Sequence, residues 1–311
     1  MASEIRFGVQ YNGVSMVSIM GPIPFAQQAE QWGFDAYFVP DLETLSSLDP
    51  MTLLASVAQH TNHIMLGTGV LVVPFRSPYQ LAKVAASVDI LTSGRLILGL
   101  GAGLLPKDFA VEQVDRRKRG KITDEALRVI RSLLAGDTVN HAGDYYEMTD
   151  TRLAPAPTRQ VPIWLGGSWD NGFADAVINR VATFGDGFHP TDVPVEGYAA
   201  AISQIEGIAA GQGRDVDFDW ACNMWLNIGA NKNDALAAVQ SALNSRFGDD
   251  AWEAHPEDCY ALGTPADCIE TIERYADIGV STFVINVLTS PEDLLPTLEV
   301  FSKEVIPHFR R

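Results

Sequence analysis

The chain has 311 residues, 47% of them hydrophobic, and Asp and Glu outnumber Lys and Arg by 39 to 22. This composition allows a sizeable core, and a formal net charge of -17 repels nucleic-acid phosphates and anionic lipid, which excludes nucleic acid and membranes as expected partners. The three cysteines form no CxxC pair, no apolar run reaches the roughly 18 residues of a membrane span, and the N-terminus has no leader pattern, so we expect a cytoplasmic protein.

Short β-branched runs alternate along the chain with stretches of helical periodicity. Strands are expected at 5–10, 35–39, 64–73, 96–98, 162–165 and 282–286, and helices at 24–32, 51–59, 81–91, 124–134 and 172–181. Such alternation indicates parallel strands joined by helical crossovers. We find no linker, and the length suits one (β/α)8 barrel as well as two domains.

Several helix starts are marked by a capping residue followed by proline. The pairs are Asp49-Pro50, Ser77-Pro78, Thr264-Pro265 and Ser290-Pro291. Proline suits the first helical position because its missing N–H would have no intrahelical partner there. Thr264 with Asp267, and Ser290 with Asp293, also resemble capping boxes. A closing helix is expected after Ser290, with the apolar stripe Leu294, Leu298, Phe301 and Val305.

Glycines gather directly after the expected strands, at 67 and 69, 99 to 103, 166 and 167, and 185 and 187. In a (β/α)8 barrel these positions form the active-site face. Glycine lets a backbone approach a ring or phosphate closely, so the clusters indicate a ligand-binding face, although each alone also suits a tight turn. The run from Gly99 to Gly103 is GxGxG rather than GxGxxG, which argues against a dinucleotide-binding fold.

The turn Gly166-Gly167-Ser168 precedes an expected helix and is a candidate anion site. Backbone N–H groups at a helix entry attract a phosphate, and the Ser168 hydroxyl adds a donor; alternatively Ser168 caps the helix, and the two roles are compatible. His60 and His63 lack a nearby carboxylate, so we expect a surface pair and no catalytic metal. No GxSxG elbow for a nucleophilic serine is present.

Segments over most of the chain resemble the luciferase-like monooxygenase superfamily, in particular its short branch of deazaflavin-dependent (coenzyme F420) oxidoreductases. The most specific are LGTGVLVVPFRSP, SGRLILGLGAG and PIWLGGS; AEQWGFDAYFVPD, RGKITDEALRVIRSLLAGDTV, FGDGFHP and GTPADCIETIERYADIGVSTFVIN also fit. The resemblance implies one α/β domain over residues 1–311, a (β/α)8 TIM barrel with an insertion (103–160) after the fourth strand, and a homodimer.

The resemblance also implies a flavin or deazaflavin ring lying over the barrel mouth. In this family the third strand ends in a non-proline cis peptide that supports the ring, and by position that bond is Gly69-Val70. The glycine run after the fourth strand lines the other edge of the ring, and the turn after the fifth strand holds the phosphate. The implied cofactor-binding residues are Gly69, Val70, Gly101, Ala102, Gly103, Gly166, Gly167 and Ser168.

The chain departs from the family where relatives place proton-transfer residues. Many relatives have Asp-His after the second strand, where this chain has Asp41-Leu42, and deazaflavin-dependent sugar-phosphate dehydrogenases have a glutamate at the position of Leu104. The remaining acid–base candidates are Asp41 and His189, although backbone N–H groups could satisfy the first and the second could be a capping or surface histidine. Candidate substrate contacts are Tyr11, Asn12, Leu104 and Trp225, of which Tyr11 and Asn12 equally suit a plain loop.

These features favour an oxidoreductase that transfers hydride between coenzyme F420 and a small organic substrate. One alternative is an FMN-dependent monooxygenase, and another is a non-catalytic flavin-binding barrel, with which Leu42 and Leu104 are compatible. The basic run 116–121 (RRKRGK) could meet the polyglutamate tail of F420 or could be a solvated helix face.

Overall fold

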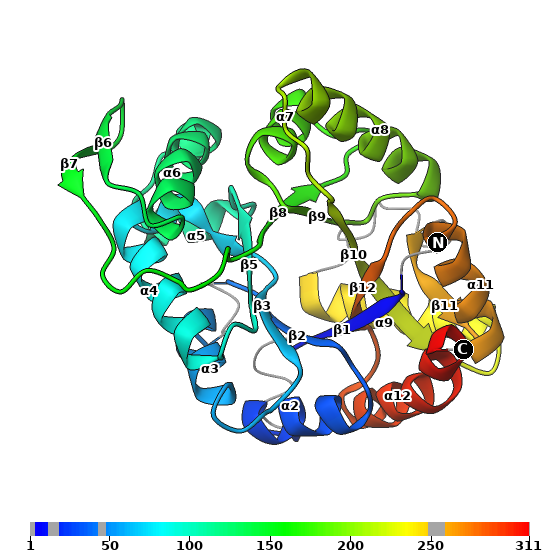
Figure 1. Ribbon diagram of the computed structural model, residues 1–311. Helices are drawn as coiled ribbons and strands as arrows, with labels where there is room; N and C mark the ends of the chain where they lie inside the picture. The colour runs from blue at the N-terminus through cyan, green and yellow to red at the C-terminus, as the bar shows by residue number, and fades with distance from the viewer. Residues whose placement is uncertain (1–3, 12–18, 43–47, 248–258, 311) are drawn as a thin grey trace.

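The computed structural model describes residues 4–11, 19–42, 48–247 and 259–310, so Asn12 lies outside the described residues. Its parallel strands close into a barrel in the order β12, β1, β2, β3, β5, β8, β9 and β10, because β10 pairs with both β9 and β12 (Figure 1). The barrel strands are β1 (Arg6–Gln10), β2 (Ala36–Val39), β3 (Met65–Thr68), β5 (Leu96–Gly101), β8 (Ile163–Ser168), β9 (Gly187–Thr191), β10 (Asp219–Ile228) and β12 (Thr282–Val287). The predicted (β/α)8 barrel is confirmed.

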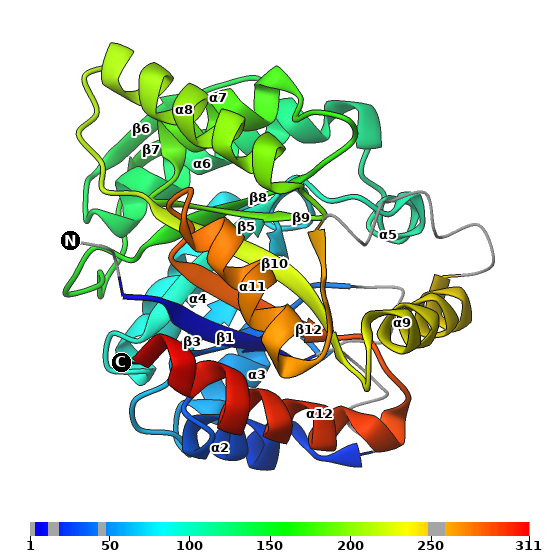
Figure 2. The same cartoon turned by 90° about the vertical axis from the view of Figure 1, so that its right-hand side faces the viewer.

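Helices cover the outside of the barrel, and α5 and α9 lie beyond the end toward which β1 runs (Figures 1 and 2). The helices are α2 (Pro22–Gln31), α3 (Pro50–Val57), α4 (Pro78–Leu91), α5 (Pro106–Val111), α6 (Arg119–Leu134), α7 (Asp175–Phe184), α8 (Val195–Gly211), α9 (Lys232–Phe247), α11 (Pro265–Ala276) and α12 (Leu294–Val300). Within the described ranges no helix has the length and apolarity needed to cross a membrane.

The predicted caps are confirmed at two helices and wrong at two. The Asp49 side chain accepts a hydrogen bond from Thr52 N at 2.8 Å, and Thr264 and Asp267 form a complete capping box. Ser77 makes no side-chain cap bond, and neither does Ser290, whose hydroxyl donates to the Asp293 carboxylate instead. At these helices proline alone favours the start, because its ring already holds a helical φ.

The insertion after the fourth barrel strand contains α5, α6 and a hairpin that the sequence did not predict, β6 (Val139–Ala142) with β7 (Glu147–Thr151). The Glu125 carboxylate on α6 fastens the hairpin turn by accepting from the backbone N–H groups of Asp144, Tyr145 and Tyr146. The chain closes with α12, which continues through a π-turn (Phe301–Val305) into a 3-10 helix (Ile306–Arg310). The predicted stripe along it is buried at Leu298, Phe301 and Val305 and half-buried at Leu294.

Inside the barrel, large rings occupy a layer below the mouth. Phe38 and Trp164 stack at 5.6 Å between centroids, together with Ala36, Ile97, Ala221 and Val284. Strand side chains alternate between faces, so Gly166, Asn223 and Asn286, two positions beyond Trp164, Ala221 and Val284, also point inward. Gln10, Gly69 and His189 lie next to them, and together these residues form a polar layer.

Candidate active site

A cavity of about 1320 Å³ opens at the carboxyl ends of the barrel strands, on the polar layer. Its wall contains all of the residues predicted to bind the cofactor, Gly69, Val70, Gly101, Ala102, Gly103, Gly166, Gly167 and Ser168. Asp41, His189, Leu104 and Trp225 lie in the same wall. The structure therefore gathers residues from widely separated segments of the chain into one site at the catalytic face of the barrel.

The Val70 side chain forms a ledge between two glycines of neighbouring strands. A Cβ atom added at Gly101 would lie 2.7 Å from Val70 Cγ2, and one added at Gly166 would lie 3.1 Å from the same atom. The Gly69-Val70 peptide is cis, as the resemblance predicts. Any larger residue at either glycine would push Val70 into the cavity, so these glycines keep the floor open for a flat ligand.

Other glycines of the same clusters serve the core instead. A Cβ at Gly67 would lie 2.3 Å from the Phe38 ring, and one at Gly187 would lie 2.5 Å from the Trp164 ring. These glycines make room for the large rings inside the barrel. This packing role is neither of the two that the sequence suggested, a ligand-binding face or a tight turn, and it applies at positions along the same strands as the glycines of the cavity wall.

His189 lies on the cavity floor with 5% of its surface exposed. Register places it beside Gly166, and its ring contacts Phe38 and Trp164. Among the described residues neither ring nitrogen has a hydrogen-bond partner, and burial lowers the pKa of the imidazole to about 4. At neutral pH the ring is thus uncharged, with one donor and one acceptor left for a ligand.

Asp41 lies in the same wall, but a cation pairs with it. Both of its oxygens accept hydrogen bonds from the Arg76 guanidinium, at 2.6 and 3.0 Å, and Oδ2 also accepts from Val72 N at 2.8 Å. This bidentate pair joins the end of β2 to the segment after the cis peptide. Its geometry favours holding that segment in place over proton transfer.

The end of the cavity at β8 and α7 is rich in hydrogen-bond donors and positive charge. Ser168 is exposed there, but the N-cap of α7 is Ala174, which makes no side-chain bond, so the interpretation of Ser168 as the cap is wrong. The helix begins three residues later than predicted because Gly172, at φ +153, lengthens the loop. Ser168 is thus left for other partners.

Three arginines line this end. Arg117 and Arg180 pair with Asp115 and Asp124, whereas Arg119 has no carboxylate partner among the described residues. Burial lowers the pKa of Arg119, and the neighbouring charges of Arg116 and Arg180 lower it further. Such mutual repulsion means that an anion bound here would be stabilised.

The predicted substrate contacts are divided. Leu104 lies on the rim with 59% of its surface exposed, and Trp225 is half-buried in the wall. Tyr11, in contrast, is in the core between Phe25 and Tyr37, and its hydroxyl donates to the Met20 carbonyl at 3.2 Å. It turns away from the cavity because it follows Gln10, which points inward, and successive side chains alternate.

Polar residues that the sequence analysis did not single out lie in the cavity wall at Gln10, Thr191, Asp192 and Asn223, and Asn286 lies fully buried next to them. Asn286 donates to Gln10 Oε1 and Asn223 Oδ1, Asn223 donates to Thr191 Oγ1, and Thr191 donates to the Asp192 carboxylate. A signal for them exists in the sequence. Asn223 and Asn286 each interrupt an apolar strand at an inward position, and buried amides require partners.

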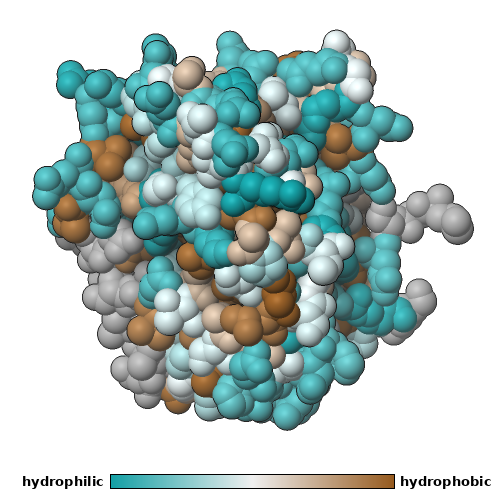
Figure 3. Space-filling view, turned by 60° about the vertical axis from the view of Figure 1, so that its left-hand side comes forward, coloured by the Kyte–Doolittle hydropathy of each residue, from teal (hydrophilic) through white to brown (hydrophobic). Residues whose placement is uncertain are grey.

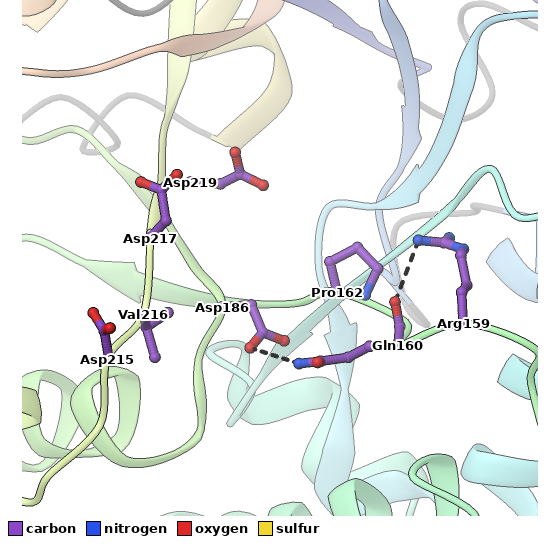
Figure 4. A pocket seen from close by; sticks show the side chains of 8 residues that line it. All are labelled: Arg159, Gln160, Pro162, Asp186, Asp215, Val216, Asp217 and Asp219. Atoms are coloured by element: carbon purple, nitrogen blue, oxygen red, sulfur yellow. Dashed lines mark hydrogen bonds between the residues drawn. The ribbon is translucent and has the colours of Figure 1, made fainter.

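A second, smaller cavity of about 420 Å³ lies at the opposite end, where β8, β9 and β10 begin (Figure 4). Two of its acids are already paired, Asp186 with Arg131 and Asp219 with Arg6. In the part of the chain that the structure describes, no group of three or more His, Cys, Asp or Glu side chains could hold a metal ion.

Comparison with known proteins agrees with this geometry. The model of the luciferase-like monooxygenase family matches residues 22–282. The chain is 28% identical to 4-hydroxyprotoasukamycin monooxygenase of Streptomyces nodosus subsp. asukaensis, over 94% of this chain and 87% of that one. It is 26% identical to an F420-dependent glucose-6-phosphate dehydrogenase of Amycolatopsis mediterranei, over 93% and 94% of the two chains.

Among solved structures, an F420-dependent secondary alcohol dehydrogenase in complex with an F420-acetone adduct superposes with a TM-score of 0.83. It is 20% identical in sequence, over 99% of this chain and 100% of that one, and so supports the fold. The match of the family model over most of the chain decides the assignment: this protein belongs to the luciferase-like monooxygenase family.

Proposed function

We propose that the protein is an oxidoreductase that transfers hydride between coenzyme F420 and a small organic substrate. The observation that carries the proposal is the floor of the large cavity, where the Val70 ledge lies between Gly101 and Gly166 beside the unpartnered His189. An open floor suits a flat ring, and a buried imidazole without a partner suits a polar atom of a bound molecule. Relatives in the family include F420-dependent dehydrogenases.

In this proposal Gly69, Val70, Gly101, Ala102 and Gly103 would hold the ring. Gly166, Gly167 and Ser168 would hold the phosphate. When bound, F420 supplies a ring carbon that gives or takes the hydride. The protein's own contribution is to position the substrate and to exclude water.

The arginine-lined end favours F420 over FMN. A polyglutamate tail adds negative charges beyond the phosphate, and Arg119 offers a cation without a carboxylate partner among the described residues. The run RRKRGK thus supplies part of the cavity wall, through Arg117, Arg119 and Gly120, and is more than a solvated helix face.

His189 is the group best placed to hold a substrate oxygen. Its neutral ring can donate a hydrogen bond to a carbonyl oxygen or accept one from a hydroxyl group, which orients the reacting carbon toward the ring. We assign Asp41 to supporting the Val72 segment through Arg76, and Leu104 and Trp225 to the walls that exclude water.

A titration of the purified full chain with F420 and, separately, with FMN tests the proposal. We expect F420 to bind at least about tenfold more tightly than FMN, since each 1.4 kcal/mol of extra anion binding is worth tenfold. Arg119→Gln should weaken F420 binding several-fold, whereas Arg152→Gln, an exposed arginine outside the cavity, should leave it unchanged. Binding of FMN alone would overturn the choice of cofactor, and binding of neither would overturn the assignment of the cavity.

FMN-dependent monooxygenation is the second candidate, because a monooxygenase is among the relatives that align over most of the chain. If FMN binds and reduced FMN consumes oxygen faster when an organic substrate is added, this candidate replaces the first. A chain that binds a cofactor tightly but turns over no substrate would be a non-catalytic flavin-binding barrel.

We further propose a cytoplasmic homodimer. The three cysteines, Cys222, Cys259 and Cys268, are buried free thiols, which suits a reducing compartment. Helix α4 exposes apolar side chains at Val84, Ile90 and Leu91. Figure 3, which brings the side with α4 and α6 toward the viewer, shows apolar side chains gathered in the middle of that face among polar ones. Such a patch is a candidate subunit interface.

A further inference from the structure

The wall of the cavity formed by β9 and β10 contains a carboxylate held in a fixed orientation. Asp192 directly follows β9, in a left-handed conformation with φ +55. Its Oδ1 accepts from Trp225 Nε1 at 2.9 Å and from the Tyr260 hydroxyl at 2.7 Å. Its Oδ2 accepts from Thr191 Oγ1 at 3.1 Å. The floor network that runs from Asn286 through Asn223 and Thr191 thus ends on this carboxylate as its last acceptor.

These three donors are neutral, so they orient and partly stabilise the carboxylate but place no positive charge beside it. No Lys, Arg or His in the described ranges pairs with Asp192, whereas Asp41 in the same cavity has a bidentate arginine. Three donors leave at least one lone pair of the carboxylate available. A partly buried carboxylate without a cation is costly, and a cationic ligand would relieve that cost.

The surroundings of Asp192 are those that recognise ammonium groups. The Trp225 and Tyr260 rings lie 6.3 Å apart at an interplanar angle of 52°, and both line the cavity. An ammonium group gains from an aromatic face as well as from a charge-assisted hydrogen bond to a carboxylate. Burial and the nearby Asp192 charge raise the pKa of Tyr260, so its hydroxyl remains a donor at neutral pH.

Charged side chains of both signs therefore line the cavity, and Asp170, which follows β8, is also in this wall. Arg117, Arg119 and Arg180 line the end at α7, and Asp192 lies at the end formed by β9 and β10. We infer that Asp192, Trp225 and Tyr260 form an ammonium-binding subsite, and that the substrate is an organic molecule carrying a protonated amine. The inference rests on the proposed function only in taking the arginine-lined end for the cofactor.

Calorimetric titration of the full chain with benzylamine, benzyl alcohol and benzoate tests this. The three probes are similar in size, and at neutral pH they are cationic, neutral and anionic. We expect benzylammonium to bind about tenfold more tightly than benzyl alcohol, and benzoate to bind most weakly. Asp192→Asn should remove the tenfold advantage and change benzyl alcohol binding by less than about twofold.

Asp217→Asn is the matched control, because Asp217 lies in the second cavity at the far end of the barrel and its substitution makes the same change in net charge. It should leave the preference for benzylammonium intact. Equal losses in both variants would mean a general effect of charge and would overturn the subsite. Equal affinity of the wild type for benzylammonium and benzyl alcohol, or no measurable benzylammonium binding, would also overturn it, whether or not Asp192→Asn folds.

The result can be separated from that of the proposed function. F420 and FMN titrations of Asp192→Asn should match those of the wild type, and a loss of cofactor binding would overturn the inference by placing Asp192 in the cofactor site. A selective benzylammonium site in a chain that binds neither cofactor would support the subsite and remove the proposed function. F420 binding without selectivity for benzylammonium would support the proposed function and overturn the subsite.

Discussion

The two candidates for proton transfer, Asp41 and His189, lie in one cavity and have opposite environments. Arg76 and the Val72 backbone occupy both oxygens of Asp41, while both nitrogens of His189 lack a partner. A buried polar group without a partner loses the hydrogen bonds that it made to water, and a bound ligand can restore them. Of these two residues, His189 is the better candidate to bind a ligand.

His189 should make the stability of the protein depend on pH. Burial lowers the pKa of its imidazole from 6.5 to about 4, so between these values the unfolded chain binds the proton and the folded chain does not. The stabilisation is complete above pH 6.5 and is lost as the pH falls toward 4, by roughly 3 kcal/mol in total. Urea unfolding of the wild type and of His189→Phe at several pH values should show a smaller acid loss in the variant.

Nitrogen-15 NMR of the histidine rings gives an independent check. The His189 ring should stay neutral down to about pH 4. A midpoint for His189 near 6.5, or equal acid losses in wild type and His189→Phe, would show that the ring is not desolvated.

At the scale of elements, the strand ends divide their glycines between core and cavity, and Gly101 tests the division. Gly101→Ala places a Cβ 2.7 Å from Val70 Cγ2, so Val70 must move into the space proposed for the ring. Overpacking of this kind costs about 1–3 kcal/mol, which predicts a loss of about tenfold or more in cofactor affinity. Fluorescence titration with F420 measures it.

Gly207→Ala provides the control, because a Cβ added there, within α8, meets nothing within 4 Å. The double variant Val70→Ala with Gly101→Ala should regain much of the affinity, since the smaller side chain at 70 restores the space. If Gly101→Ala binds F420 as well as Gly207→Ala does, the Val70 ledge is not part of the cofactor site.

Periodicity in the sequence predicted the alternation of strands and helices, since it reports which side of an element faces the core. It could not show that the run 64–73 breaks at Gly69-Val70 into β3 and a two-residue strand, β4 (Leu71–Val72); only the resemblance indicated the cis bond. The hairpin β6–β7 was also missed, because its exposed strands carry little apolar pattern and depend on Glu125 for their turn.

Only part of the candidate site could be predicted from the sequence. Glycines at strand ends are visible in the sequence, so the glycines of the cavity wall could be named. Arg180 and Asp192 could not be predicted, because only the folded chain brings them to the cavity. Arg180 lies in the middle of α7, and Asp192 accepts hydrogen bonds from Trp225 and Tyr260, which are 33 and 68 positions away in the sequence. Spacing along the chain carries no sign of such contacts.

For the whole molecule, the net charge is -17, but positively charged side chains cluster in one place. Much of the surface repels anions, yet Arg117, Arg119 and Arg180 gather at one end of the cavity. An anionic cofactor would therefore be attracted only near that end, and it would enter with its charged part already directed there. The polarity of the cavity can thus orient a ligand before any close contact forms.

The exposed apolar side chains of α4 predict where the two subunits of the homodimer meet. Val84, Ile90 and Leu91 are 42, 43 and 51% exposed. In a symmetric dimer each substitution acts twice, so Leu91→Glu removes the burial of two half-exposed leucines, worth roughly 0.8–1.5 kcal/mol each, and should raise the dissociation constant about tenfold or more. Sedimentation should show a dimeric wild type and a monomeric Leu91→Glu. Val111→Glu, at an equally apolar position 61% exposed on α5, should remain dimeric. A monomeric wild type would refute the dimer, and dissociation of both variants alike would move the interface away from α4.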